Sequence, residues 1–199
     1  MLIDETRIAS MALVNIGKKV IRSFDQGGNE AKICKQEYDV ARLITLEGAL
    51  WNFASGWKAG VRLGIDPKPG WAYVYSYPNE ALKVFRIIPD DRKSRSPIPF
   101  EVTDRMDAPG KIIHTDHEAP CFEFTRDKED VSTFSWEFIQ AFSWQLSKRI
   151  CMPLTKNPKM LEKCEINADL YTAVAEASSA NESDETQDGM AKYHEVRDD

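Results

Sequence analysis

The stretch from Asn29 to Ala54 constrains the fold of this chain more than any other part of the sequence. Its apolar residues recur at three- and four-residue spacing, which predicts a helix of about six turns with Asn29 as its N-cap. Two stripes share this spacing: Val40, Leu43, Ile44, Glu47, Leu50 and Trp51 on one, and Ala31, Cys34, Tyr38, Ala41 and Thr45 on the other. A helix apolar over so much of its circumference must be covered on more than one side.

Three more segments carry the same helical spacing. Ile3 to Val20 predicts a first helix, and the turn at Gly27-Gly28 then predicts an antiparallel hairpin with the Asn29 helix. Val131 to Met152 predicts a third helix, with Ser132 as N-cap and Pro153 as its stop. Lys159 to Ala180 predicts a fourth, whose buried stripe holds Leu161, Cys164, Ala168, Tyr171, Ala175 and Ser178.

Between these helices the pattern changes to short runs rich in β-branched and aromatic residues, separated by Pro, Gly and Asp. Such runs predict strands. Five are present: Trp71 to Pro78, Ala81 to Ile88, Pro99 to Arg105, Lys111 to Asp116 and Cys121 to Asp127. The chain is therefore expected to be an α+β protein, a four-helix bundle-like domain (1–58 and 131–180) with an inserted small antiparallel β-sheet or sandwich (59–130) and an extended C-terminal tail (181–199).

Charge is concentrated at the C-terminus. The chain of 199 residues has a net charge of −6, and residues 181–199 hold seven acids against Lys192 and Arg197, so the other residues are close to neutral. This distribution does not favour a protein that reads duplex DNA. Met190, Tyr193 and Val196 interrupt the polar tail and are typical of anchor residues for a partner.

The sequence predicts a protein made in a reducing cytoplasm, without a membrane span. Its four cysteines lack metal-finger spacing, and Cys34 and Cys164 fall on apolar stripes. The N-terminus has early acids and no long apolar core, unlike a secretory signal. No apolar run approaches the length needed to cross a bilayer.

Candidate chemistry is sparse. His114 and His117 are candidate metal ligands. Positions three apart on a strand face opposite sides, however, so the pair is better explained as part of a polar hairpin tip. Carboxylates that could pair as in a glycosidase are Asp104 with Asp107, or Glu101 with Glu123. The tryptophans at 51, 57, 71, 136 and 144 lack interleaved cations, which favours core or interface over stacking on bases or sugars. We expect no catalytic, cofactor or metal site.

The third helix carries more apolar surface than one side of a small domain needs, so it is either central in a bundle or shared with a neighbouring subunit. We expect a subunit interface at Trp136, Phe138, Phe142, Trp144 and Tyr171.

Five segments in this order resemble the tail tubular protein A family, the head-to-tail adaptors of T7-like short-tailed bacteriophages. They are ALVNIGKKVIRSFDQGG (12–28), EYDVARLITLEGALWNFA (37–54), YVYSYPNEALKVFRI (73–87), KIIHTDHEAPCFEFTRD (111–127) and SWEFIQAFSWQLSKRICMPLTKNPKM (135–160). Together they span most of the chain. Tyr77-Pro78 stands where the family has Leu-Pro.

The resemblance implies a structural virion protein of the tail or neck, assembled in the host cytoplasm. Such adaptors form a homo-oligomeric ring, typically of twelve copies, between the portal protein and the tail nozzle protein, and DNA passes through without being read. It also implies portal-binding residues near the C-terminus, for which Met190, Tyr193, Val196 and Arg197 are the candidates. Two alternatives stay open: a tail-associated glycan hydrolase using carboxylates of the β region, and a cytoplasmic interaction module unrelated to phage.

Overall fold

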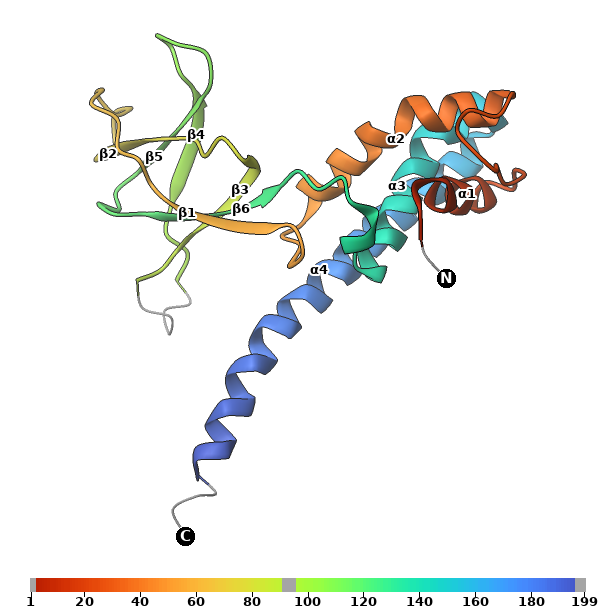
Figure 1. Cartoon of the computed structure of the whole chain (residues 1–199). Helices are drawn as coiled ribbons and strands as arrows, with labels where there is room; N and C mark the ends of the chain where they lie inside the picture. The colour runs from red at the N-terminus through yellow and green to blue at the C-terminus, as the bar shows by residue number, and fades with distance from the viewer. Residues whose placement is uncertain (1–2, 91–95, 196–199) are drawn as a thin grey trace. The chain divides into compact units, whose positions relative to one another are not determined.

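The computed structural model describes residues 3–90 and 96–195, with side chains as far as 178. The chain divides into two compact units, a helical unit (1–53 with 128–199) and a β unit (54–127). The helices lie in the first and the strands in the second (Figure 1). The predicted α+β class, with a β insertion between helices, is confirmed. The unit borders fall a few residues before the expected ones at 58 and 130.

Helix α3 (Trp136–Thr155) is the centre of the helical unit and contacts the other three helices: α1 (Glu5–Asn15), α2 (Asn29–Gly48) and α4 (Pro158–Glu195). Of its apolar residues, Phe138, Ile139, Ala141, Phe142, Leu146 and Ile150 are buried, whereas Trp136 is exposed. Phe138 has no exposed surface, and its ring lies between Trp51 at 4.9 Å and Phe134 at 4.7 Å, measured between centroids. Of the two positions predicted for this helix, the structure shows the central position in a bundle.

Capping and turn residues set the ends of the helices, and the sequence pattern located these ends only approximately. α1 stops at Asn15 because Gly17 (φ 72°) turns the chain, so Val20 lies outside the helix. The N-cap of α2 is Gly28 (φ 133°) and not Asn29. The N-cap of α3 is Ser135, whose hydroxyl accepts the Phe138 N–H at 3.2 Å.

The other end of α3 also differs from expectation. Pro153 was expected to stop this helix but lies within its last turn, and the helix ends where Lys156 adopts the left-handed conformation (φ 51°). A proline removes one helical hydrogen bond without reversing the chain, whereas a left-handed residue redirects it. Ser132, the expected N-cap, lies in a short 3-10 helix, η1 (Val131–Thr133), ahead of α3.

The two predicted apolar stripes of α2 differ in how far they are buried. Ala31, Cys34 and Tyr38 are buried with the rest of their stripe, whereas Val40 and Ile44 on the other stripe are exposed. The sequence predicts that this second side is covered, and within the described chain it is covered only in part: Trp51 is buried and Leu43 and Leu50 are half-buried.

α4 packs on α3 through the stripe that the sequence predicted, with Cys164, Ala168 and Ala175 buried. Asn157 caps its start by accepting the N–H groups of Lys159 and Met160 at 3.1 and 3.3 Å. The helical backbone of α4 continues past the predicted helix end at Ala180 to Glu195. Residues 181–195 contain no proline and only one glycine, so the local sequence does not break the helix.

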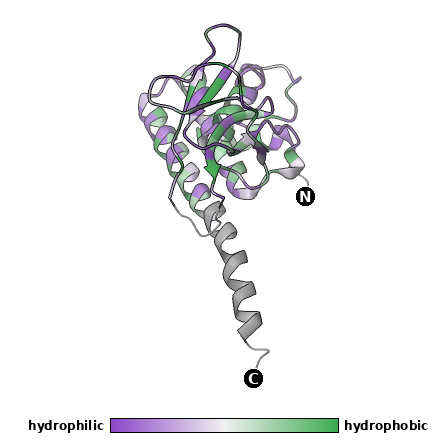
Figure 2. Cartoon of the chain, turned by 90° about the vertical axis from the view of Figure 1, so that its left-hand side faces the viewer, coloured by the Kyte–Doolittle hydropathy of each residue, from purple (hydrophilic) through white to green (hydrophobic). Residues whose placement is uncertain are grey.

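The β unit holds two three-stranded antiparallel sheets. One has the order β1 (Ser55–Ala59), β6 (Cys121–Arg126), β3 (Ala81–Ile88); the other has the order β2 (Tyr73–Ser76), β5 (Lys111–Thr115), β4 (Phe100–Asp104). Strand β1 was not predicted, because its sequence, SGWKA, has few β-forming residues and pairs at an edge of its sheet. Figure 2 shows polar residues on the loops and apolar residues within the strands.

Both sheets contribute to one core. Tyr75 and Ile113 come from one sheet, and Val84, Phe122 and Phe124 from the other. Between β1 and the next strand the backbone of Gly60 approaches this core closely. A Cβ there would lie 2.8 Å from Tyr75 Cδ1 and 2.9 Å from Pro120 Cγ, so only glycine fits.

Candidate interaction surfaces

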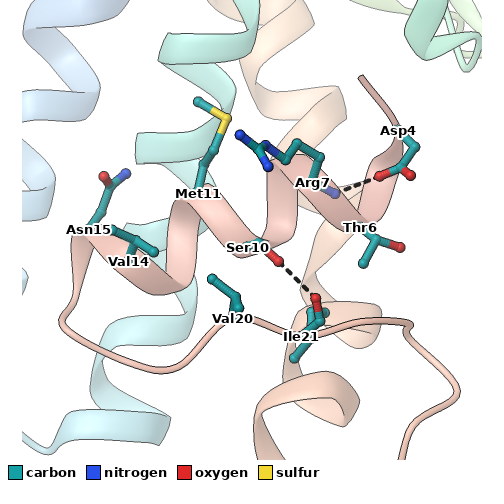
Figure 3. A pocket seen from close by; sticks show the side chains of 9 residues that line it. All are labelled: Asp4, Thr6, Arg7, Ser10, Met11, Val14, Asn15, Val20 and Ile21. Atoms are coloured by element: carbon teal, nitrogen blue, oxygen red, sulfur yellow. Dashed lines mark hydrogen bonds between the residues drawn. The ribbon is translucent and has the colours of Figure 1, made fainter. Parts of the chain in front are cut away.

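The helical unit has a hollow of about 530 Å³ between α1 and the segment that follows it (Figure 3). Residues that line it are Asp4, Thr6, Arg7, Ser10, Met11, Val14, Asn15, Val20 and Ile21. The Ser10 hydroxyl donates to the Ile21 carbonyl at 3.1 Å and fixes the segment against the helix. Gly17 makes this arrangement possible by turning the chain back. We call this hollow the α1 groove.

The α1 groove is apolar at one side and cationic around its edge. Val14 and Val20 are 58% and 59% exposed although both are aliphatic. Arg7 lines the groove, and the neighbouring segment GKKVIR (17–22) carries three cations and no acid. Asp4 lies at the other end, where its carboxylate accepts the Arg7 N–H at 2.7 Å as the N-cap of α1.

A second apolar surface lies on α4, on the side away from α3. Ile166, Leu170 and Val174 recur every four residues and are 61%, 53% and 55% exposed. Four exposed acids lie beside them on the same helix: Glu162, Glu165, Asp169 and Glu176. Because residues seven apart lie on nearly the same side of a helix, Glu162, Asp169 and Glu176 form an acidic edge. We call the three apolar residues the outer row.

The residues predicted for a subunit interface fall into three groups. Trp136, 56% exposed, is available to a neighbour. Phe138 and Phe142 have no exposed surface, so we correct their role to core packing within the helical unit. Trp144 and Tyr171 are half-buried and stack on each other, with centroids 6.1 Å apart and rings 14° from parallel, which joins α3 to α4.

Of the predicted portal-binding residues, Met190 and Tyr193 lie on the backbone of α4, and their side chains fall outside the described residues. Val196 and Arg197 lie wholly outside them.

The histidine pair does not form a metal site. His114 lies buried on β5, where Nδ1 accepts the Lys68 N–H at 3.3 Å and Nε2 lies 3.0 Å from the Thr103 hydroxyl. Burial lowers the pKa of His114. His117 instead lies 3.3 Å from the Asp90 carboxylate. Within residues 3–90 and 96–178 no three His, Cys, Asp or Glu side chains gather as a metal would require.

The carboxylates considered for glycan hydrolysis are mostly occupied by neighbouring cations. Glu101 accepts from Lys68 Nζ at 2.5 Å and from Trp71 Nε1 at 3.1 Å, which lowers its pKa. Asp107 pairs with Arg105 at 2.8 Å, which lowers its pKa as well, and Glu123 pairs with Arg86. A general acid needs a raised pKa, so the shifts at Glu101 and Asp107 run against that role. Asp104 ends β4 opposite Lys111.

The tryptophans differ in their surroundings. Trp51 is buried and donates its indole N–H to the Thr45 carbonyl at 2.9 Å. Trp57 is 74% exposed on β1, so it is not a core residue, and it lines a shallow hollow with Lys58, Glu80 and Arg126.

Cys34 and Cys164 are buried, as the sequence pattern predicted. Burial raises the pKa of each thiol to about 12, with the neighbouring Cys151 adding to the effect at Cys164. Thiols of this kind are small core residues without nucleophilic character at neutral pH.

Sequence reasoning missed the α1 groove and the outer row. The four-residue spacing of Ile166, Leu170 and Val174 could have predicted the outer row, but the apolar stripe on the other side of the helix is stronger. The groove had none, because it depends on the turn at Gly17.

Neither a scan against models of protein families nor a search of curated proteins finds a match to this chain. Among the helices of the described residues, none is long and apolar enough to cross a membrane.

Proposed function

We propose that this chain is a structural virion protein, a ring-forming adaptor that joins the portal vertex to the tail nozzle of a short-tailed phage. In this proposal about twelve copies, as is typical of the family it resembles, form part of the DNA ejection channel in the neck of the virion. The subunits are made in the host cytoplasm. The protein joins the portal to the tail nozzle and catalyses no reaction.

The observation that carries the proposal is the agreement between the five family-like segments and the order of elements. The segments correspond in turn to α1 with the following turn, α2, the β2–β3 pair, the β5–β6 pair and α3. A helical unit interrupted by a β unit is the arrangement that the resemblance implied. The exposed outer row of α4 gives such a subunit apolar surface for a neighbour.

The charge of the chain suits a channel that DNA crosses without being held. Proteins bind DNA largely by placing Lys and Arg on phosphates, and this chain carries a net charge of −6. A negative wall would repel the duplex and keep it mobile. Cryo-electron microscopy of assembled rings tests this point, which fails if the acidic C-terminal segment lies outside the bore.

The direct test is the mass of the protein alone and with the portal protein encoded in the same genome. Light scattering after size exclusion should find either rings of the free chain or rings assembled on portal. A chain that stays monomeric and never binds portal would contradict the proposal.

A variant ending at Ala180 tests the C-terminal segment, which carries the four portal-binding candidates. The fold should stay intact, because the α4 residues that the structure shows buried, Cys164, Ala168 and Ala175, precede this point. Binding to portal should weaken, and circular dichroism of the truncated protein provides the folding control. Unchanged binding would remove residues 181–199 from the mechanism.

A further inference from the structure

We infer that the α1 groove of one copy receives the outer row of α4 from the next copy, so that subunits join head to tail. This inference rests on the proposed function, since it assigns the two surfaces through which ring subunits would meet. Both surfaces belong to the helical unit, and both helices that carry them are fixed to α3 by their other faces.

The two surfaces match in length. On α1 the groove runs from Thr6 to Asn15 and on α4 the outer row runs from Ile166 to Val174, about 14 and 12 Å of helix at 1.5 Å per residue. The groove is a hollow of about 530 Å³ with Met11, Val14 and Val20 along it, and the outer row projects three aliphatic side chains. Docking would therefore remove from water side chains that are now more than half exposed on both partners.

Their charges are opposite. The groove has Arg7 in its lining and Lys18, Lys19 and Arg22 in the adjoining segment. The outer row has the acidic edge of Glu162, Asp169 and Glu176 beside it, and these acids outnumber the exposed Lys163 on the same side of α4. Opposite charges around an apolar centre favour encounter in one orientation and disfavour pairing of either surface with itself. Two grooves, or two outer rows, would bring like charges together.

Because the groove and the outer row are different surfaces, each copy keeps one of the two free after the first contact. Interfaces of this kind close into rings or continue as open chains, whereas an interface that pairs one surface with itself stops at a dimer. The occupant of the groove is therefore a second copy of this chain, and repeated docking builds the assembly.

Three valines of nearly equal exposure allow a matched test: Val14 in the groove (58%), Val174 in the outer row (55%) and Val61 in the β unit as control (59%). Each is changed to Asp in the full chain. Sedimentation velocity is measured over a range of concentrations, with and without the portal protein of the same genome. Val14→Asp and Val174→Asp should each weaken association about thirtyfold or more, as for a hot-spot residue. Val61→Asp should behave as the wild type.

Mixing the two disrupted variants tests that the surfaces are partners of each other. Val14→Asp keeps its outer row and Val174→Asp keeps its groove, so an equimolar mixture should form dimers of one copy each that do not grow. A mixture that stays monomeric would overturn the inference, as would variants that both assemble like the wild type. In the second case the ring proposal would survive, whereas a wild type that stays monomeric even with portal would end both.

Charge reversal provides a second pair of variants that leaves the apolar residues in place. One variant carries Glu at Lys18, Lys19 and Arg22, and the other carries Lys at Glu162, Asp169 and Glu176. Each alone should associate poorly. The mixture should grow beyond dimers, because the two unchanged surfaces pair as in the wild type and the two reversed surfaces pair with each other. A mixture that stops at dimers would show that these charges do not face each other.

Discussion

Helices α3 and α4 lie against each other but use their apolar residues differently. α3 is surrounded by three helices, and apart from Trp136 its aromatic residues are buried or half-buried within the helical unit. α4 buries one narrow side made of Cys164, Ala168 and Ala175 and leaves Ile166, Leu170 and Val174 in solvent. The difference shows that a high proportion of apolar residues in a helix does not by itself locate an interface. The apolar surface left over for a partner lies on the less hydrophobic helix.

The largest expected effect concerns α3, the helix whose aromatic residues are mostly buried. Phe138→Ala removes a ring that contacts Trp51, Phe53, Phe134 and Phe142, and should lower the free energy of unfolding by about 3–5 kcal/mol. Trp136→Ala, two residues away but 56% exposed, should cost less than about 1 kcal/mol. Urea titration followed by far-ultraviolet circular dichroism measures both. Equal losses would mean that α3 is not the core helix described here.

The two sides of α4 give the next contrast. Ala168→Leu inserts extra volume where α4 lies against α3 and should cost about 1–3 kcal/mol of stability. Leu170→Ala on the outer row should change stability by less than about 0.5 kcal/mol and instead weaken association. Thermal unfolding at low concentration separates the two effects. A destabilised monomer for Leu170→Ala would place the outer row in the core.

The smallest effect is a pH dependence of the buried side of α4. The pKa of Cys164 is about 12 in the folded state against 9.0 for a free thiol, so the folded protein holds this proton while the unfolded chain loses it. The contribution of Cys164 to stability is therefore complete below pH 9 and is lost as the pH rises towards 12. Between pH 9 and 10 the loss should be about 1 kcal/mol.

Cys164→Ala should remove this part of the alkaline slope, measured by urea titration at each pH against the wild type. Cys121→Ala is the comparison: partial burial and the nearby Glu123 also raise the pKa of this thiol, so this variant should remove a smaller part of the slope. An unchanged slope for Cys164→Ala would show that the thiol is open to solvent.

Much of this fold followed from periodicity. The spacing of apolar residues located the four helices and the buried stripes of α2 and α4, and β-branched runs located five of the six strands. Three- and four-residue spacing shows which side of a helix is apolar, and burial of one such side is what holds the helix in place.

Sequence reasoning failed where structure depends on contacts that no local pattern encodes. Phe138 and Phe142 have the pattern of surplus surface because the rings that cover them lie outside the helix: Trp51, Phe53 and Phe134 contact Phe138, and Tyr38 contacts Phe142. Val20 is exposed because the turn at Gly17 ends α1 before it. Strand β1 pairs with β6 across 62 positions of sequence between Ala59 and Cys121 and 70 positions between Ser55 and Thr125, so only the folded sheet reveals it.

Covalent linkage tests the head-to-tail contact most directly. The protein carries Val14→Cys and Val174→Cys together in a Cys121→Ser background, which leaves the other native thiols buried. It is treated with a short bismaleimide under the conditions in which the wild type assembles. The account predicts a ladder of covalent oligomers for the double variant and none for either single variant. A Val174→Cys protein that links to itself, or a double variant that gives no ladder, would contradict it.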